Sequence, residues 1–391
     1  MEPDLSLLDA LLEDEDADGY LIEDASRNSD QLYLSGFDAP DSFVTLYTDG
    51  EIDLLVSGLE YGRARSESRA DHVARLSDYD YQDKAAAHGP REANHRVLRE
   101  FLSDRSVDRL VVPPRFPIAV ADALREQDLS LAPDLEDTVT ETRATKTDDE
   151  IEHVRRAQRA TEAAMKAAET LLREADAESG VLHHSEEALT SERLKEEIEI
   201  TLLRRGCALE ETIVACGADA ADPHDRGSGP LHADEAIVID IFPREKESKY
   251  HADMTRTFAV GEPGETIQEW YDITLEAKEA ALAAIEPGVT GADVHDAVCD
   301  VYESAGLPTL RSDESTETGF IHGTGHGVGL DIHEQPRVNP SGGKLRPGHV
   351  ITIEPGLYDP EVGGVRIEDL VVVREEGYEN LTEYPDEFVL E

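Results

Sequence analysis

The sequence predicts an α+β protein of two domains, a smaller amino-terminal α/β domain over residues 1–142 and a larger α+β domain over residues 143–391. The first part alternates strand-like and helix-like stretches, and a polar segment, ETRATKTDDE, separates it from the rest. The remainder twice runs a pair of amphipathic helices and then apolar strands, which suggests two related halves. A chain of 391 residues is also too long for one ordinary hydrophobic core.

The amino-terminal domain is predicted from four stretches. GYLIED at 19–24 is strand-like, and FVTLYTDGEIDLLVS at 43–57 predicts a hairpin that turns at its Asp-Gly pair. The apolar DRLVVP at 108–113 and the amphipathic IAVADALREQ at 118–127 continue the alternation of strand and helix. No constellation of catalytic residues appears in this part of the sequence.

The second domain is predicted from helix caps and apolar runs. Thr147 and Glu150 match the capping-box pattern that starts a helix, and Thr290 and Asp293 cap a later one. Four helices are predicted, over about 147–174, 190–205, 265–285 and 291–305. Strands are predicted at ETIVACG, EAIVIDIF, HVITIEPGLY and VRIEDLVVV.

The charge balance is extreme, with 87 acidic residues against 36 basic ones and a net charge of −51. The acids are spread over the whole length, and only eight of the basic residues are lysine. This pattern is typical of proteins from salt-loving organisms, whose ionic strength screens the self-repulsion. An ordinary acidic cytosolic protein is the alternative. In either case the field repels nucleic acid, so no nucleic-acid partner is expected.

The sequence predicts a cytoplasmic protein without a membrane partner. No apolar run approaches the roughly 20 residues that span a bilayer, and the first residues lack the features of a secretory signal. Cys207, Cys216 and Cys299 are odd in number and widely spaced, so they form neither a CxxC pair nor a disulfide framework.

Five residues are candidate metal ligands: Asp240, Asp253, His326, Glu354 and Glu368. Several of the carboxylates interrupt apolar, strand-like runs, where burial without a partner costs several kcal/mol. A bound cation would compensate that cost. Four carboxylates and one imidazole suit two divalent ions such as Mn, Co, Fe or Zn. For each residue alone a salt bridge or a helix cap is an equal alternative, and the set of five weakens that alternative.

The histidine-rich stretch HGTGHGVGLDIHE at 322–334 carries one of these candidates, and its alternating glycines would let backbone and substrate approach closely. The adjoining HEQPR begins like the zinc-peptidase motif HExxH. However, Arg337 replaces the second histidine and Pro336 would break the helix that the motif requires. The HExxH interpretation of this stretch is therefore discarded.

These segments together resemble the pita-bread metallopeptidases, the group that contains Xaa-Pro aminopeptidases, prolidases and creatinase. The resemblance covers most of 145–391 and is carried by DPH at 222–224, IDIFPREKESKYHADMTRTF, HGTGHGVGLDIHEQP, TIEPGLY and VRIEDLVVV. LYLSGF gives a weaker resemblance to the family's creatinase-like amino-terminal domain. The resemblance implies a pita-bread catalytic domain with two metal ions, manganese above all, held by the five candidate ligands.

The resemblance also implies roles for individual residues. Glu354 would handle the proton of the attacking water as well as binding metal, and His333 would hydrogen-bond the scissile carbonyl. His224, His322 and Arg366 would line the substrate site. Arg366, two residues before Glu368, would share a strand face with it and orient a carboxylate ligand.

The leading functional prediction is an Xaa-Pro aminopeptidase, acting as a homodimer on peptides with proline at the second position. An Xaa-Pro dipeptidase is the main alternative. A hydrolase or lyase for non-peptide substrates and a non-catalytic binding protein on the same fold are less favoured. One departure from the family is a longer step, thirteen residues, from Asp240 to Asp253, which leaves the substrate preference open.

Overall fold

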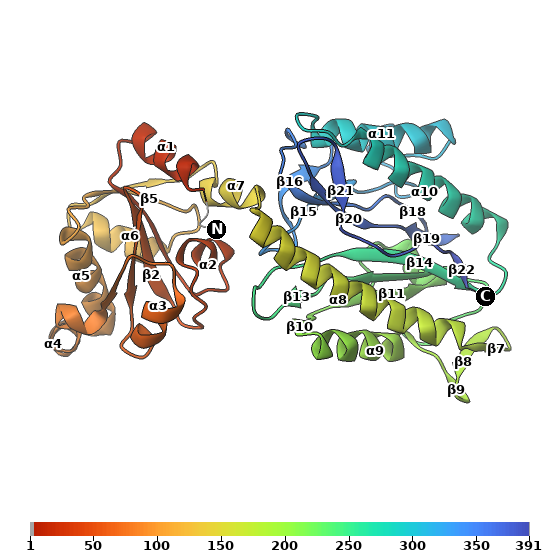
Figure 1. Cartoon of the computed structure of the whole chain (residues 1–391), viewed down its shortest axis with the longest axis horizontal. Coiled ribbons are helices and arrows are strands. Elements are labelled where there is room, and N and C mark those ends of the chain that lie inside the picture. Colours follow the sequence, from red (N-terminus) through yellow and green to blue (C-terminus); the bar gives the residue numbers. More distant parts are fainter. Residues whose placement is uncertain (1–3, 391) are drawn as a thin grey trace. The chain divides into compact units, whose positions relative to one another are not determined.

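The computed structural model describes residues 4–390, and its contacts divide the chain into two compact units. The division falls between Arg143 and Ala144. Each unit has its own sheets and its own hydrophobic core (Figure 1). Within residues 4–390, no helix is long and apolar enough to cross a membrane.

The amino-terminal unit contains a mixed six-stranded sheet in the order β4-β3-β2-β1-β5-β6. The predicted hairpin is confirmed, because β2 and β3 pair in antiparallel and turn at Asp49 and Gly50, both with positive φ. The strands are β1 Gly19–Asp24, β2 Phe43–Thr48, β3 Glu51–Val56, β4 His72–Arg75, β5 Arg109–Val112 and β6 Ser130–Pro133. The helices are α1 Ser6–Asp14, α2 Ser29–Ser35, α3 Tyr61–Glu67, α4 Tyr81–His88, α5 Pro90–Ser103, α6 Ile118–Arg125 and α7 Thr138–Ala144.

The second unit begins with one helix pair on a four-stranded sheet, ordered β11-β12-β14-β22. The predicted capping box is confirmed: Thr147 N donates to Glu150 Oε2 at 2.8 Å, and Glu150 N donates to Thr147 Oγ1 at 3.4 Å. The helices are α8 Asp148–Arg173 and α9 Ser191–Arg204. The strands are β11 Thr212–Cys216, β12 Ile237–Ile241, β14 Met254–Val260 and β22 Val389–Leu390. The apolar faces of these elements form one continuous core.

A second helix pair packs with a five-stranded sheet, ordered β16-β15-β17-β20-β21. The helices are α10 Glu265–Ala284 and α11 Gly291–Ser304. The strands are β15 Gly325–Gly327, β16 Glu334–Val338, β17 Val350–Ile353, β20 Asp369–Val373 and β21 Tyr378–Asn380. In Figure 1 the five-stranded and four-stranded sheets of this unit lie between the α8–α9 pair and the α10–α11 pair. The unit therefore has two halves of like construction, as the repeated helix–strand order predicts.

Small sheets complete the second unit. They are formed by β7 Asp176–Glu178, β8 Val181–His184 and β9 Glu187–Ala188, by β10 Cys207–Ala208 with β13 Arg244–Glu245, and by β18 Gly356–Asp359 with β19 Gly363–Arg366. The strand-like segments predicted at 349–358 and 365–373 are confirmed, and each forms parts of two strands. Each run is broken, the first at Glu354-Pro355 and the second at Ile367-Glu368. Proline has no N–H for a ladder, and Glu368 N instead donates to Thr255 O at 3.0 Å.

Candidate metal centre

The candidate ligands come from both halves of the second unit. Asp240 lies in β12, and Asp253 directly precedes β14, the neighbouring antiparallel strand. His326 lies in β15, and Glu354 and Glu368 occupy the two strand breaks. Residues more than 100 positions apart in the sequence thus meet because the two sheets face one another.

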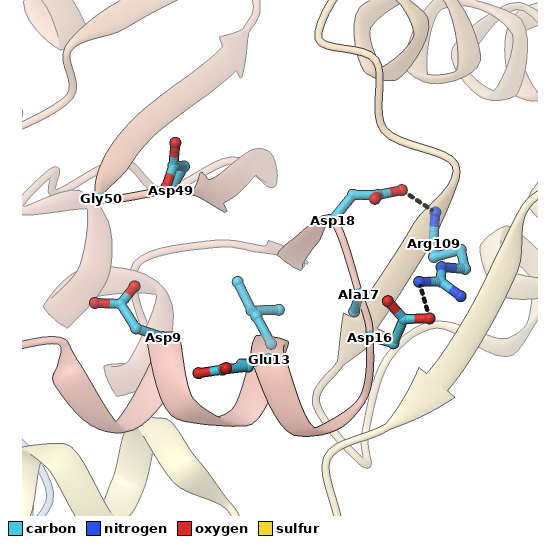
Figure 2. A pocket seen from close by; sticks show the side chains of 9 residues that line it. Asp9, Glu13, Asp16, Ala17, Asp18, Asp49, Gly50 and Arg109 are labelled. Atoms are coloured by element: carbon cyan, nitrogen blue, oxygen red, sulfur yellow. Dashed lines mark hydrogen bonds and ion pairs between the residues drawn. The ribbon is translucent and has the colours of Figure 1, made fainter.

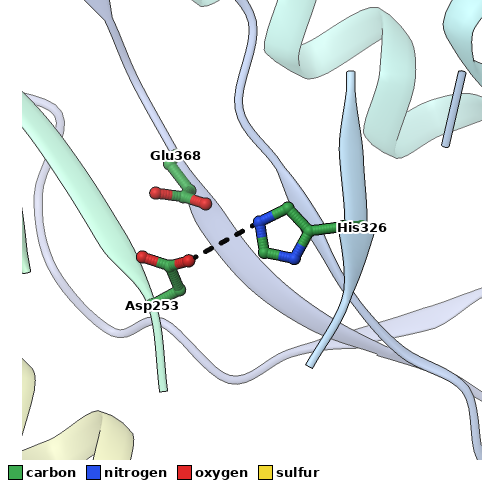
Figure 3. Close-up of side chains that lie close together, drawn as sticks. All are labelled: Asp253, His326 and Glu368. Atoms are coloured by element: carbon green, nitrogen blue, oxygen red, sulfur yellow. Dashed lines mark ion pairs between the residues drawn. The ribbon is translucent and has the colours of Figure 1, made fainter. Parts of the chain in front are cut away.

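Three of these side chains lie close enough to hold one ion. The candidate ligand atoms of Asp253, His326 and Glu368 all lie within 4.8 Å of one another (Figure 3). His326 Nε2 is 3.7 Å from Asp253 Oδ2 and 3.4 Å from Glu354 Oε1. Asp240 lies near the same group, since its charge acts on the carboxyls of Asp253, Glu354 and Glu368.

Three carboxylate oxygens at this centre are buried and have no hydrogen-bond partner: Asp240 Oδ1, Asp253 Oδ1 and Glu368 Oε1. Buried polar atoms in proteins are nearly always paired, because an unpaired one forfeits its hydration. Three such oxygens beside a neutral imidazole form a donor set that suits hard or borderline divalent cations. The residues present therefore fit a divalent metal site.

The electrostatics point the same way. Burial, followed by repulsion among the acids, raises the pKa of Asp253 and of Glu368 well above their usual range. Burial raises the pKa of Glu354 to about 8. A bound cation would oppose these shifts by supplying the missing positive charge. Burial also lowers the pKa of His326 to about 3, which keeps the imidazole neutral and able to act as a ligand.

Neighbouring groups orient the candidate ligands. His326 Nδ1 donates to Gly327 O at 3.1 Å, so the hydrogen is on Nδ1 and the lone pair of Nε2 faces the acids. The Thr255 hydroxyl donates to Glu368 Oε2 at 2.9 Å, and the Thr352 hydroxyl is 3.4 Å from Glu354 Oε1. These contacts restrict the carboxylates before any metal binds.

Arg366 is the main basic group at the centre. Its Nη2 donates to Asp240 Oδ2 at 2.7 Å, and its Nη1 donates to the Tyr358 hydroxyl at 3.0 Å and to Pro223 O at 3.2 Å. Arg366 therefore contacts a candidate ligand, and that ligand is Asp240. Arg366 and Glu368 do not share the predicted strand face, because β19 ends at Arg366 and Glu368 lies outside both strands.

The three histidines proposed to contact substrate differ in their surroundings. His333 is exposed, with its ring centre 4.3 Å from that of His326. His224 is exposed, whereas burial is the main cause of the lowered pKa of both His322 and His333. His322 is half-buried: its Nδ1 donates to Gly323 O at 2.7 Å, and its Nε2 is 3.1 Å from the Tyr358 hydroxyl. Both ring nitrogens of His322 are therefore engaged within the protein.

Sequence reasoning did not single out three residues at the centre. Tyr358 links Arg366 to His322, and Thr255 links Arg366 to Glu368. Tyr358 and Thr255 both lie in segments that carry the family resemblance, and that resemblance could have pointed to them as site residues. Arg337 pairs directly with His326 across β15 and β16, so both side chains lie on one face of the sheet.

Two of the alternating glycines, Gly325 and Gly327, serve backbone packing. A Cβ at Gly325 would lie 1.9 Å from Thr352 O, and one at Gly327 would lie 2.1 Å from Gln335 O. Only glycine lets these strands approach so closely. The close approach at these two glycines is one between neighbouring strands of the sheet.

A pocket in the amino-terminal unit lies elsewhere and contains none of the candidate site residues (Figure 2). Its walls carry acidic side chains, among them Asp9, Glu13 and Asp49. Its one basic side chain, Arg109, pairs with Asp16 at 2.5 Å. The pocket is therefore separate from the metal centre in composition and in sequence.

Comparison with known proteins places this fold and centre in one class. The profile of metallopeptidase family M24 matches residues 152–375, and that of the creatinase/prolidase N-terminal domain matches residues 5–144. The chain belongs to metallopeptidase family M24. The predicted family, which is a family of metallopeptidases, and the predicted fold class are thereby confirmed.

Curated relatives share a third or more of their residues with this chain over part of its length. An uncharacterized peptidase of Staphylococcus saprophyticus is 35% identical over 253 residues, 64% of this chain and 66% of that protein. The Xaa-Pro dipeptidase of Pyrococcus furiosus is 40% identical over 174 residues, 44% of this chain and 47% of that protein. The alignments thus span less than two thirds of these relatives.

Solved structures match over nearly the whole chain. The prolidase from Pyrococcus horikoshii superimposes with a TM-score of 0.78 at 26% identity, covering 98% of this chain and 99% of that one. The X-Pro aminopeptidase from Thermotoga maritima gives a TM-score of 0.78 at 26% identity, covering 96% and 98%. Dipeptidases and aminopeptidases are therefore equally similar to this fold.

Proposed function

We propose that this chain is an Xaa-Pro aminopeptidase, which uses two divalent metal ions to hydrolyse the bond before a proline at the second position of a peptide. The observation that carries the proposal is the set of three unpaired buried carboxylate oxygens beside His326, in a chain of family M24. The similarity to a solved X-Pro aminopeptidase supports the substrate class.

The proposed metal ligands are Asp240, Asp253, His326, Glu354 and Glu368. Bound divalent ions, manganese by preference and cobalt, iron or zinc as alternatives, would lower the pKa of water and polarise the scissile carbonyl.

The remaining roles belong to groups of the chain. Glu354 accepts the proton of the attacking water. His333 donates a hydrogen bond to the carbonyl oxygen as negative charge develops there. His224 and His322 border the substrate, and Arg366 holds Asp240 in place and borders the same site.

An Xaa-Pro dipeptidase is the second candidate, supported by the 40% identity to such an enzyme. A dipeptidase has to recognise the free carboxylate of proline. Arg337 has the required charge: its side chain is exposed, and after burial its positive field is a further cause of the lowered pKa of both His326 and His333. No ion pair or hydrogen bond within residues 4–390 engages its guanidinium.

The two candidates are separated by comparing Xaa-Pro dipeptides with Xaa-Pro-Yaa tripeptides, in high salt with added Mn or Co. An aminopeptidase cleaves the tripeptides at least as well as the dipeptides. In a dipeptidase that uses Arg337, Arg337→Gln raises KM for dipeptides by about 10-fold or more, as expected for a lost charged hydrogen bond. KM for tripeptides stays unchanged in that variant.

The same assay tests the peptidase function itself. Glu354→Gln is the matched inactive control, because it keeps the size of the side chain and removes its basicity. Absence of cleavage by protein carrying two metal ions would contradict the proposal. Cleavage of a non-peptide amide in the same panel would favour a hydrolase or lyase for non-peptide substrates. A non-catalytic binding protein would hold well below one ion per chain after dialysis.

The proposal includes a cytoplasmic homodimer without nucleic-acid partners. The three free cysteines fit a reducing compartment, and the net charge of −51 opposes contact with nucleic acid. The homodimer rests on the family resemblance. Sedimentation equilibrium in high salt tests it, and a single species with the 43.0 kDa mass of one chain would contradict it.

A further inference from the structure

The segment that carries His333 runs from the end of β15 to the start of β16, residues 328–333, and is here named the His333 loop. Within it, Gly329 N donates to Asp331 O at 3.0 Å. The His333 side chain is exposed, yet its ring centre is only 4.3 Å from that of His326. The placement of this imidazole therefore depends on what holds the loop.

Glu334, the residue after the loop, packs its carboxylate against the loop backbone. The side chain is only 2% exposed, and its Oε2 accepts a hydrogen bond from Asp331 N at 3.3 Å. A Cβ at Gly329 would lie 2.3 Å from Glu334 Oε1, so the carboxylate occupies the space that this glycine leaves open. One buried carboxylate thus contacts the loop at two places, Gly329 and Asp331.

Lys146 fixes that carboxylate from a distant part of the sequence. Its side chain is 1% exposed, and its Nζ donates to Glu334 Oε1 and, at 3.3 Å, to Ala144 O. Its backbone N donates to Gly348 O at 2.9 Å, which holds the lysine in turn. Both the ammonium and the backbone of Lys146 are therefore held by hydrogen bonds.

A buried ion pair of this kind is a poor explanation for stability. The desolvation of both charges offsets most of their attraction, and an apolar pair of similar volume is often equally stable. What the pair does supply is direction, because the lysine engages Glu334 Oε1 while the other oxygen holds the loop backbone.

We propose that Lys146 and Glu334 are positioning residues that hold the His333 loop, so that the His333 imidazole stays beside the candidate metal centre. The proposal rests on the proposed function, in which His333 donates a hydrogen bond to the scissile carbonyl. A donor that meets charge mainly in the transition state affects kcat more than KM. Loss of the pair therefore lowers kcat.

The test compares Lys146→Met with the double variant Lys146→Met/Glu334→Leu. The single variant leaves the buried Glu334 carboxylate without its positive counter-charge and melts at a lower temperature, whereas the double variant recovers the wild-type melting temperature. In the double variant kcat on an Xaa-Pro peptide stays about 10-fold or more below wild type, with KM within about 3-fold. In a His333→Ala background, the same double replacement changes kcat by less than about 2-fold, because the affected group is gone.

A matched control uses the same substitution at two buried carboxylates that each pair with a lysine. Glu334→Gln lowers kcat, whereas Glu169→Gln, on helix α8 and 3% exposed, leaves kcat unchanged. Wild-type kcat in the double variant overturns the proposal, as does a full 10-fold loss in the His333→Ala background.

A separate readout keeps this proposal distinct from the proposed function. Metal-loaded wild type that cleaves no Xaa-Pro peptide refutes the function alone. The positioning role is then measured by the rate at which diethyl pyrocarbonate modifies His333. This rate rises by about 3-fold or more in the double variant if the pair holds the loop close to His326. An unchanged rate overturns the positioning role.

Discussion

Thr255 shows how single residues that bind no metal shape the candidate centre. Its hydroxyl donates to Glu368 at 2.9 Å and accepts from Arg366 Nε at 3.2 Å. A carboxylate with one oxygen held in this way keeps one orientation, and its other oxygen stays unpaired for a cation.

Thr255→Val removes this hydroxyl with little change of volume. We expect the affinity for Mn²⁺ to fall by about 10–100-fold, because Glu368 loses the partner that orients it. Calorimetric titration of metal-free protein measures the change. Thr382→Val is the control, since that hydroxyl accepts from Gln158 and Leu370 and touches no candidate ligand. Equal affinities in the two variants would contradict the role given to Thr255.

At the scale of elements, β15 and β17 can pair only because Gly325 has no side chain. We expect Gly325→Ala to separate the strands, since its Cβ would lie 1.9 Å from Thr352 O. Overpacking of this kind costs about 1–3 kcal/mol, and here it also displaces His326. Urea unfolding and metal content together measure both effects. Gly343→Ala, where a Cβ has no neighbour within 4 Å, is the control and stays close to wild type.

Most elements could be predicted because their signals are local. The Thr147 and Thr290 capping boxes and the Asp-Gly hairpin turn each depend on residues within four positions. The break after Glu354 is also local, because Pro355 has no N–H for a ladder, whereas the break at Glu368 could not be read in this way. The second break follows from a hydrogen bond between Glu368 N and Thr255 O, groups more than 100 residues apart, and a strand propensity contains no such information.

For the whole molecule, the net charge of −51 makes ionic strength the main external variable. We expect the melting temperature and the activity to rise between about 0.1 M and 2 M KCl, because the Debye length falls from about 10 Å to under 3 Å. Sucrose of equal osmolarity separates screening from general solute effects. Full stability and activity at low salt would contradict an adaptation to high salt.

Acid acts on the whole molecule through buried neutral histidines such as His349. Burial, with the nearby charges of Lys146 and Arg346, lowers its pKa from about 6.5 to about 3. Between these values the unfolded chain binds one more proton than the folded chain, so stability falls as the pH drops below about 6.5.

The cost is about 1.4 kcal/mol per pH unit for each such histidine. We expect His349→Gln to flatten the slope of unfolding free energy against pH between 6 and 4 by about this amount. Urea titrations at constant salt measure both slopes. A parallel slope in the variant would show that His349 is already protonated in the folded state.

The sequence by itself determined the family, the order of the elements and the candidate ligands, because each depends on short motifs that keep their spacing along the chain. Only the tertiary structure decided which carboxylate oxygens are left without partners, and that Arg366 holds Asp240. It also decided that both ring nitrogens of His322 contact groups of the protein, and that Lys146 pairs with Glu334 next to the His333 loop. These are facts about burial and pairing across distant segments, and such contacts exist only once the two sheets have packed together.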